Sequence, residues 1–333
     1  MDSIGAGMSS EISTIDERSA STGVAEADRN KAYPRMASGI VFGIVAAIAF
    51  GTNPLFAKPL YSLGFSVDSV LLLRFLPATI LMGFIAKFRC RTLRVTKYEL
   101  LWSVIAGIFF CLSSLTLFMS YRDIDVGVAA TLLFVYPVIV AVISGVIFRE
   151  TIPLRVFIAL SLSIGGVALL CRSSGEARIT WRGVLLSLSA AVFYSGYLIW
   201  IARSPARKMV PEKLTFYALL TCLIFYFLRL KCGLAMEGAF SARACYNIAG
   251  LSLISAALSL ACASEALQRS GAMVTSVLGA LEPLTAVFFG WMVFHESITA
   301  KIMTGIMLIL LAVVVVACNP PQYMHPKNGK HLS

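Results

Sequence analysis

Long apolar runs alternate with short polar segments along almost all of the 333-residue chain. Most of these runs approach 20 residues, the length that a helix needs to cross roughly 30 Å of hydrocarbon. The pattern predicts an all-α membrane protein with ten transmembrane helices. The predicted spans are 38–57, 66–86, 98–119, 126–148, 154–171, 182–202, 214–230, 245–264, 272–294 and 299–318.

The pattern of five apolar runs occurs twice. Its clearest matching stretches are PVIVAVISGVIFRETI (137–152) and PLTAVFFGWMVFHESI (283–298). In both, a proline opens the run and a glutamate, Glu150 or Glu296, closes it. Because five is an odd number of spans, the second copy must be inverted relative to the first. The expected organisation is a disordered cytoplasmic tail (1–35), two inverted five-helix repeats (36–172 and 180–318) and a polar cytoplasmic tail (319–333).

The distribution of charge predicts the orientation. Charged residues make up 14% of the chain, against roughly a quarter in soluble domains. With the N-terminus inside, more Lys and Arg residues fall on the cytoplasmic side than opposite, as the positive-inside rule requires. Both termini are therefore expected in the cytoplasm, with the protein in the plasma membrane. The densest basic cluster, at 87–97, is a short predicted loop, so the net charge of +11 implies no nucleic-acid partner.

Several kinds of chemistry lack their sequence signals. The eight cysteines are scattered without a CxxC pair, and the three histidines are not at metal-ligand spacing. P-loop, GxGxxG, GxSxG and HExxH motifs are absent from the sequence. We therefore predict no metal, no cofactor and no enzymatic activity. An intramembrane enzyme or sensor would need a nucleophile–base or metal constellation, and none is visible in the spans.

Together these features resemble the drug/metabolite transporter superfamily, in particular its EamA-type members with ten spans. The pieces that carry the resemblance are AAIAFGTNPLFAK (46–58), LLLRF (71–75), GVAATLLFVYPVIVAVISGVIFRETI (127–152), LSAAVFYSGYLIW (188–200) and GAMVTSVLGALEPLTAVFFGWMVFHESI (271–298). The resemblance implies ten helices, two inverted repeats, a central substrate cavity and alternating access. It implies no particular substrate.

Two prolines occupy corresponding positions in the two halves, Pro137 and Pro283. Proline frees a carbonyl on the preceding turn, and in lipid this group must be satisfied by protein or by cavity water. Paired interruptions of this kind point to a transporter's binding site near the membrane midplane. They fit two interpretations, lining of the substrate pathway or bending of the helices for packing alone.

Glu282 precedes Pro283 and lies near the middle of its predicted span. A central carboxylate should face the bundle interior, because exposure of the charge to lipid is costly. It is a candidate for proton coupling or for binding a cationic group of a substrate. Alternatively, it is a protonated carboxyl group that binds carbonyls loosened by the proline. Tyr136 (aligned with Glu282), Asn53 and Tyr197 are further candidates for the cavity wall.

Three other charged residues have mainly structural interpretations. Arg74 can snorkel towards the outer interface or turn inward as a gate or structural cation. Glu150 and Glu296 are each followed by a hydroxyl residue and isoleucine, which favours capping of the next helix and a tight reversal.

The predicted function is that of a secondary active transporter, a permease that moves a small organic metabolite, with amino-acid-like compounds as the first choice. The alternative is a nucleotide-sugar or organophosphate exchanger, which predicts several inward Lys or Arg residues, whereas only Arg74 lies well inside a span. The expected partners are a small-molecule substrate, the lipid bilayer and coupled protons. The oligomeric state stays open.

Overall fold

The computed structural model of the protein describes residues 37–90, 92–147, 154–172, 180–205, 209–263, 265–266, 269, 278–279 and 281–317. Helices and no strands are found among these residues, as the predicted all-α fold requires. The tails predicted at 1–35 and 319–333 lie outside the described residues, and so does Glu150.

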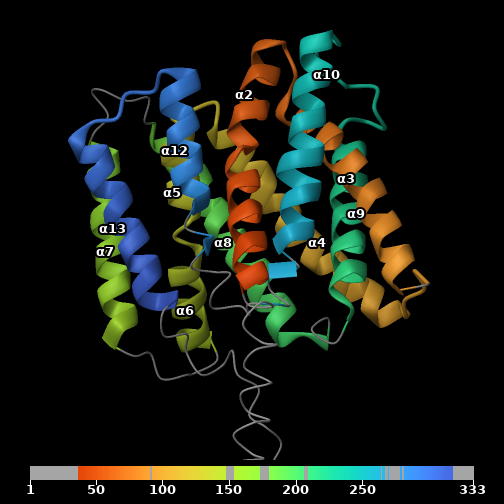
Figure 1. Ribbon diagram of the computed structural model, residues 1–333, viewed down its shortest axis with the longest axis horizontal. Helices are drawn as coiled ribbons and strands as arrows, with labels where there is room; N and C mark the ends of the chain where they lie inside the picture. Colours follow the sequence, from red (N-terminus) through yellow and green to blue (C-terminus); the bar gives the residue numbers. More distant parts are fainter. Residues whose placement is uncertain are drawn as a thin grey trace, which may run out of the picture.

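The helices pack side by side into one bundle (Figure 1). The first runs over Ala37–Ser62 and turns at Thr52, where its second part, α2 (Asn53–Ser62), begins. The others are α3 (Val67–Cys90), α4 (Lys97–Ser120), α5 (Val126–Leu133), α6 (Tyr136–Ile147), α7 (Leu154–Arg172), α8 (Trp181–Arg203), α9 (Pro211–Arg229), α10 (Ala242–Ala249), the π-helix η2 (Gly250–Leu258), α12 (Leu281–Phe294) and α13 (Ala300–Ala317).

Seven helices in the described chain are long and apolar enough to cross a membrane. They correspond to the first four predicted spans and to the sixth, seventh and eighth. Three shorter apolar helices, Phe157–Gly166, Leu281–Phe294 and Ala300–Ala312, coincide with the other predicted spans. The chain is therefore a multi-pass helical membrane protein, and the count of ten spans stays a prediction.

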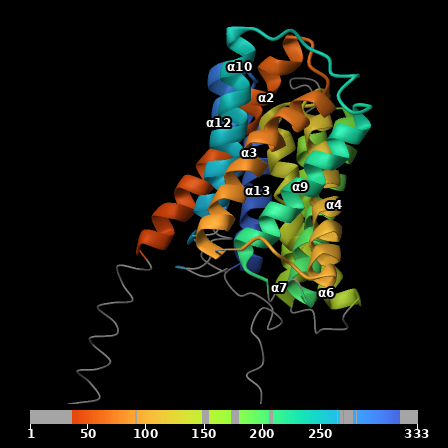
Figure 2. The same ribbon diagram turned by 90° about the vertical axis from the view of Figure 1, so that its right-hand side faces the viewer.

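Successive spans run in alternate directions between two ends of the bundle (Figure 2). At the Ser62 end, α2 finishes and α3 begins, and an ion pair joins Asp68 to Arg229 at the end of α9. At the Cys90 end, α3 finishes and α4 begins, and an ion pair joins Arg89 to Glu212 at the start of α9. We use these two names for the ends throughout.

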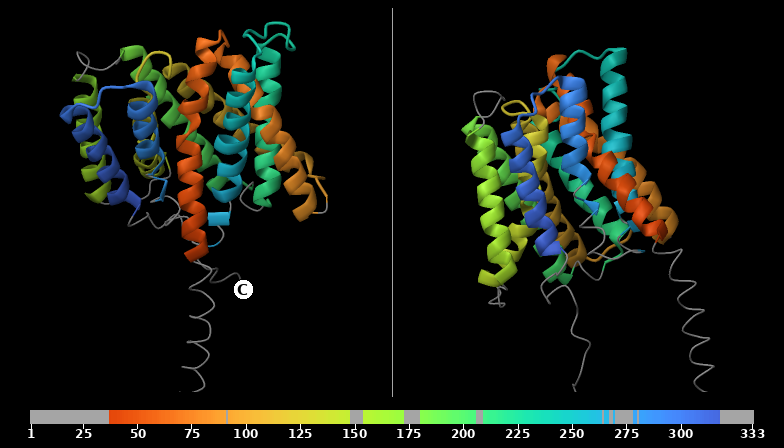
Figure 3. Two further views of the ribbon diagram at one scale, coloured as in Figure 1. Left: turned by 45° about the horizontal axis from the view of Figure 1, so that its top comes forward. Right: turned by 60° about the vertical axis from the view of Figure 1, so that its left-hand side comes forward.

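Three helix pairs join corresponding spans of the two predicted halves. α3 packs on α9, α5 on α12, and α7 on α13 (Figure 3). Glycines permit the close approach: a Cβ on Gly127 would lie 2.8 Å from the Val287 side chain, and one on Gly166 would lie 2.8 Å from the Gly305 carbonyl oxygen. Other contacts also recur when the two halves are exchanged. α4 of the first half packs on α8 and α9 of the second, and η2 of the second half packs on α2 and α3 of the first.

The two prolines of the repeated motif coincide with helix starts. The span Val126–Ile147 is broken into α5 and α6, and α6 begins one residue before Pro137. In the second half, α12 begins two residues before Pro283. Proline fits the first turn of a helix because its missing N–H is not needed there. The same residue therefore has the same local effect in both halves.

Candidate functional site

Arg74 lies inside the bundle, about two turns from the start of α3. The residue is only 2% exposed, and its guanidinium carbon lies 5.0 to 5.7 Å from the ring centroids of Phe50, Phe75 and Phe118. These rings stabilise the cation through their negative faces. Its Nε atom is buried without a hydrogen-bond partner among the described residues. Arg74 is thus turned inward rather than snorkelling to the membrane surface.

Glu282 occupies the first turn of α12, where negative charge complements the helix dipole. The residue is half-buried. Its carboxylate and Arg74 attract each other, although no direct salt bridge joins these two described residues. Glu282 also interacts electrostatically with the side chains of three tyrosines, Tyr121, Tyr136 and Tyr194. The first two belong to the first half of the chain and the third to the start of the second.

Asn53 and Thr52 lie at the turn within the first helix, and their polar groups differ. Thr52 Oγ1 donates a hydrogen bond to the Ala49 carbonyl (2.6 Å) and lies 2.9 Å from Ser255 Oγ. Asn53 is 1% exposed, yet its Oδ1 atom has no hydrogen-bond partner in the described structure. Buried acceptors are normally paired, so an unpaired one in this position is available to a ligand or to water.

The turn that carries Asn53 also contacts both charged residues. A Cβ on Gly51 would lie 2.7 Å from the Glu282 carbonyl oxygen and 2.6 Å from Thr285 Cβ. Glycine is therefore needed at this crossing with α12. One residue earlier, the Phe50 ring lies beside Arg74. The backbone at 50–53 thus connects Asn53, Arg74 and Glu282 into one cluster.

Aromatic rings continue this cluster through the bundle. The rings of Tyr136 and Tyr194 meet edge to face at 4.8 Å, and Tyr194 stacks on Tyr197 at 5.7 Å. Tyr197 in turn lies 5.3 Å from Phe110. Ser195 Oγ donates a hydrogen bond to the Tyr136 carbonyl (3.1 Å), which fixes the start of α6 against α8. We call Asn53, Arg74, Tyr136, Tyr194, Tyr197 and Glu282 the central cluster.

Most residues predicted for the cavity belong to the central cluster or directly adjoin it. Pro137 is half-buried beside Tyr136, and Pro283 is buried beside Glu282. Their participation in a substrate pathway stays a prediction. Phe50, Phe118 and Tyr121 could not be predicted as part of this site, because single aromatic residues in a membrane helix carry no signal of their own.

Glu296 has a different structural role from the predicted one. Its Oε1 atom accepts hydrogen bonds from Lys58 Nζ (2.7 Å) and from the Val126 N–H at the start of α5 (3.1 Å). The residue that caps α13 is Thr299, whose Oγ1 accepts from the Ile302 N–H. The cap that was predicted from a hydroxyl or a carboxylate in this segment is therefore the Thr299 hydroxyl, while the Glu296 carboxylate ties α2 and α5 of the first half to the end of α12.

Other charges are paired at both ends of the bundle. Asp68 accepts two hydrogen bonds from Arg229, at 2.8 and 3.0 Å. Arg89 binds both Glu212 and Glu265. The hydrogen bond from Arg89, and next that from Arg269, hold the pKa of the Glu265 carboxyl below its usual range, so Glu265 is ionised at neutral pH. Comparison of the two halves could have identified these pairs, since α3 and α9 each begin with an acidic residue and end with arginine.

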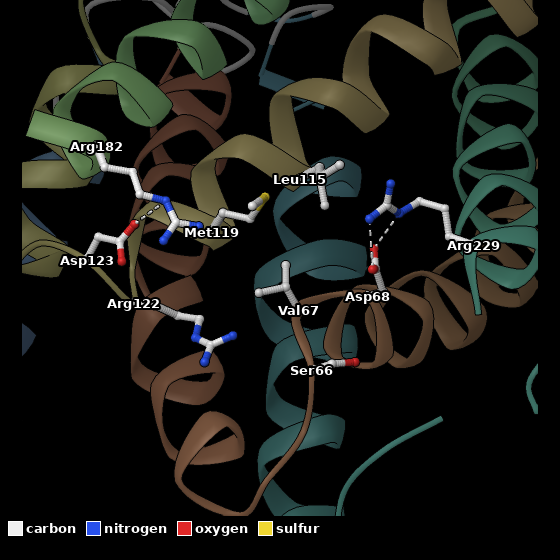
Figure 4. A pocket seen from close by; sticks show the side chains of 9 residues that line it. All are labelled: Ser66, Val67, Asp68, Leu115, Met119, Arg122, Asp123, Arg182 and Arg229. Atoms are coloured by element: carbon white, nitrogen blue, oxygen red, sulfur yellow. Dashed lines mark hydrogen bonds and ion pairs between the residues drawn. The ribbon is translucent and has the colours of Figure 1, made fainter. Parts of the chain in front are cut away.

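Two sizeable pockets open at the Ser62 end. One has a volume of about 630 Å³ and borders Lys58 and Glu296. The other has a volume of about 400 Å³ and lies between the Asp68–Arg229 pair and the Asp123–Arg182 pair (Figure 4). Arg122 lies between these two pairs (Figure 4). Neither pocket is lined by the central cluster.

Comparisons with known proteins point to one family. The sequence model described as "EamA-like transporter family" matches residues 37–172 and again 181–318. The chain is 25% identical over 230 residues to a protein of Synechocystis sp. described as "Uncharacterized transporter sll1319", which covers 68% of each chain. It is 23% identical over 163 residues to "Uncharacterized transporter YxxF" of Bacillus subtilis, covering 47% of this chain and 51% of the relative.

A solved crystal structure is similar in fold. It aligns with a TM-score of 0.61 and 16% identity, and the alignment covers 87% of this chain and 99% of that one. At this level of identity the likeness concerns the fold alone. It agrees with the helical bundle described above.

Proposed function

Because this chain belongs to the EamA-like transporter family, we propose that it is a secondary active transporter that moves a small organic metabolite across the plasma membrane by alternating access. The substrate binds at the central cluster. The observation that carries this proposal is that the turn holding Asn53 packs its Phe50 ring beside Arg74 of the first half and its Gly51 against the Glu282 backbone of the second. A site formed by both halves can open to either side as the halves move.

The chemistry of the central cluster favours an amino-acid-like substrate. Arg74 offers an unpaired Nε donor, and Asn53 offers an unpaired Oδ1 acceptor. A buried charge without a partner is costly, so its retention favours a role in ligand binding. An α-carboxylate would bind Arg74, while an ammonium group would bind Asn53 Oδ1 or Glu282. The adjacent tyrosines provide apolar surface for the rest of the solute.

The pattern of helix contacts supports two inverted repeats. α3–α9 and α7–α13 each pair a helix with its counterpart in the other half, and α5–α12 joins the fourth span to the ninth, although the shared proline makes α6 the counterpart of α12. Such self-paired contacts are expected around a twofold axis that lies in the plane of the membrane. The ten-span arrangement and the alternating exposure of the central cluster are part of this proposal.

The positive-inside rule favours a cytoplasmic location for the Cys90 end. The loop between α3 and α4 carries Arg91, Arg94 and, at the start of α4, Lys97. Both termini then lie in the cytoplasm. Glu282 is the proposed proton-coupling group, because it is the acidic member of the central cluster and can exchange a proton when that site faces water.

The alternative, an exchanger of nucleotide sugars or organophosphates, requires several cations at the depth of the site. Arg74 is the one basic side chain buried in the described part of the chain. A single guanidinium suits one carboxylate better than a phosphate ester with two or more charges. We therefore favour the amino-acid-like substrate.

The experiment begins with a thermal-shift screen of the purified protein against amino acids, purines, polyamines and sugar nucleotides. Uptake of the best stabiliser is then measured in proteoliposomes, with and without a pH gradient. We expect the gradient to stimulate uptake by the natural protein and to have no effect on Glu282→Gln. Glu237→Gln, in an exposed loop, is the matched control and should keep the stimulation. Equal stimulation of Glu282→Gln would refute coupling through this residue, and absence of uptake of any compound would refute the transport proposal.

A further inference from the structure

Ion pairs connect α3 and α9 at both ends of the bundle. Asp68–Arg229 fastens the pair at the Ser62 end, and Glu212–Arg89 fastens it at the Cys90 end. Asp68 and Glu212 are both the second residue of their helix, so the two ion pairs correspond when the halves are exchanged. Both ion pairs are formed in the same conformation. We therefore infer that α3 and α9 remain in contact at both ends. Neither of these pairs is a gate.

Arg89 makes a second contact that extends beyond the α3–α9 pair. Its Nη2 atom binds Glu265 Oε1, beyond the end of the eighth predicted span. Glu265 Oε2 also accepts from Arg269 Nε at 2.9 Å, and Arg269 Nη1 donates to Ser38 Oγ at 3.1 Å. At the Cys90 end one continuous network therefore joins α3, α9, the end of the eighth span and the start of the first helix.

The corresponding network at the Ser62 end is divided. The loop after α4 carries Asp123, which pairs with Arg182 at 3.4 Å. This pair stands apart from Asp68–Arg229, and a pocket of about 400 Å³ lies between the two (Figure 4). The Ser62 end also has ion pairs between the two halves, among them Lys58–Glu296, but in the place that corresponds to the Arg89–Glu265 contact it has a pocket.

We propose that the Arg89–Glu265 contact is a latch that closes the Cys90 end, and that it must break before the central cluster can open to that side. The Arg89–Glu212 contact is part of the permanent α3–α9 connection. This inference rests on the proposed alternating-access function and specifies its regulation. The latch favours the described conformation, in which the Cys90 end is closed and the pocket at the Ser62 end does not reach the central cluster.

A native cysteine lies beside the latch and reports on it. Cys262 is 7% exposed and precedes Glu265 by three residues, so it should become accessible when the Cys90 end opens. The other seven cysteines are replaced, and the rate of labelling by a hydrophilic maleimide is measured on purified protein in nanodiscs. A second protein carries its one cysteine as Met119→Cys, in the pocket at the Ser62 end.

Glu265→Gln removes the ion pairs with both Arg89 and Arg269, of which the Arg89 pair joins two spans. We expect the labelling rate of Cys262 to rise roughly fivefold, the effect of that partly exposed pair on a two-state equilibrium. The labelling rate of Met119→Cys should fall at the same time, because opening one end closes the other. Asp68→Asn breaks an ion pair of the permanent connection and should leave the Cys262 rate unchanged. Folding is checked for every variant by size-exclusion chromatography and melting temperature.

Two results would overturn the latch. One is an unchanged Cys262 rate in Glu265→Gln. The other is a faster Cys262 rate without slower labelling of Met119→Cys, which indicates local fraying and no coupled gate. The labelling measurement uses no substrate, so its outcome is independent of whether the transport proposal holds. A protein that transports none of the screened compounds still gives labelling rates that either support or overturn the latch.

Discussion

Charged side chains are paired at the ends of the bundle, whereas two buried polar side chains at its centre have atoms unpaired among the described residues. At the ends, Lys58 pairs with Glu296, Asp68 pairs with Arg229, and Arg89 binds two carboxylates. At the centre, Arg74 Nε and Asn53 Oδ1 are buried without hydrogen-bond partners in the described structure. Paired groups at the ends stabilise the arrangement of helices, whereas unpaired groups at the centre cost stability, and the proposed function assigns them to a ligand. The comparison can be tested with variants of the two kinds of group.

The largest expected contrast is between a central and a peripheral charge. Arg74→Leu should reduce transport roughly tenfold to hundredfold, the effect of losing a hydrogen bond to a charged group. Its melting temperature should stay the same or rise, because an unpaired buried charge has been removed. Glu212→Gln should show the reverse pattern: transport within twofold of the natural protein and a loss of about 1–3 kcal/mol of stability. Similar losses of both quantities in both variants would remove the distinction.

The crossing between the first helix and α12 gives a second contrast, between two glycines. Gly51→Ala should destabilise the protein by about 1–3 kcal/mol, because the added Cβ overlaps Thr285 and the Glu282 carbonyl. Gly165→Ala is the matched control, since a Cβ there meets no atom within 4 Å. In a helix it should stabilise by about 0.4–1 kcal/mol. Thermal unfolding of the purified variants gives both values, and a harmless Gly51→Ala would show that α12 can move away from this crossing.

The smallest contrast concerns two neighbours in one turn. Thr52→Val loses the buried contact with Ser255 and should cost about 1 kcal/mol of stability without a change in substrate affinity. Asn53→Ala loses buried packing but also removes an unpaired acceptor, so the two effects partly cancel and stability should fall by no more than about 1 kcal/mol. Substrate affinity should weaken roughly fivefold. Titration of each variant by calorimetry checks these values, and an unaltered affinity in Asn53→Ala would exclude Asn53 from the site.

The sequence predicted the helical architecture well because membrane helices need long apolar runs, and these runs are visible without a structure. The prolines of the duplicated motif were expected to kink their spans, and α6 and α12 instead begin beside them. The partners of charged residues were harder to predict. Glu296 reads as a cap for α13 from its neighbours Ser297 and Thr299, yet it pairs with Lys58 from the other half of the chain. Such partners are set by packing between distant segments, and a local pattern contains no information about them.

The inward direction of Arg74 has the same explanation. A leucine-rich segment allows an arginine to face either lipid or the interior, and the choice depends on the rings of Phe50 and Phe118 from other helices. Glu282 was predicted near the middle of its span, whereas it lies in the first turn of α12. Local chemistry was predictable, and contacts between helices required the fold.

The central claim is that both halves of the chain form one substrate site. The most direct measurement is calorimetric titration of the best-binding solute into the natural protein, Asn53→Ala, Glu282→Gln and the double variant at one pH. We predict that each single variant weakens binding at least fivefold, since each removes one contact to a shared ligand. Natural affinity in either single variant would contradict a site shared between the two halves.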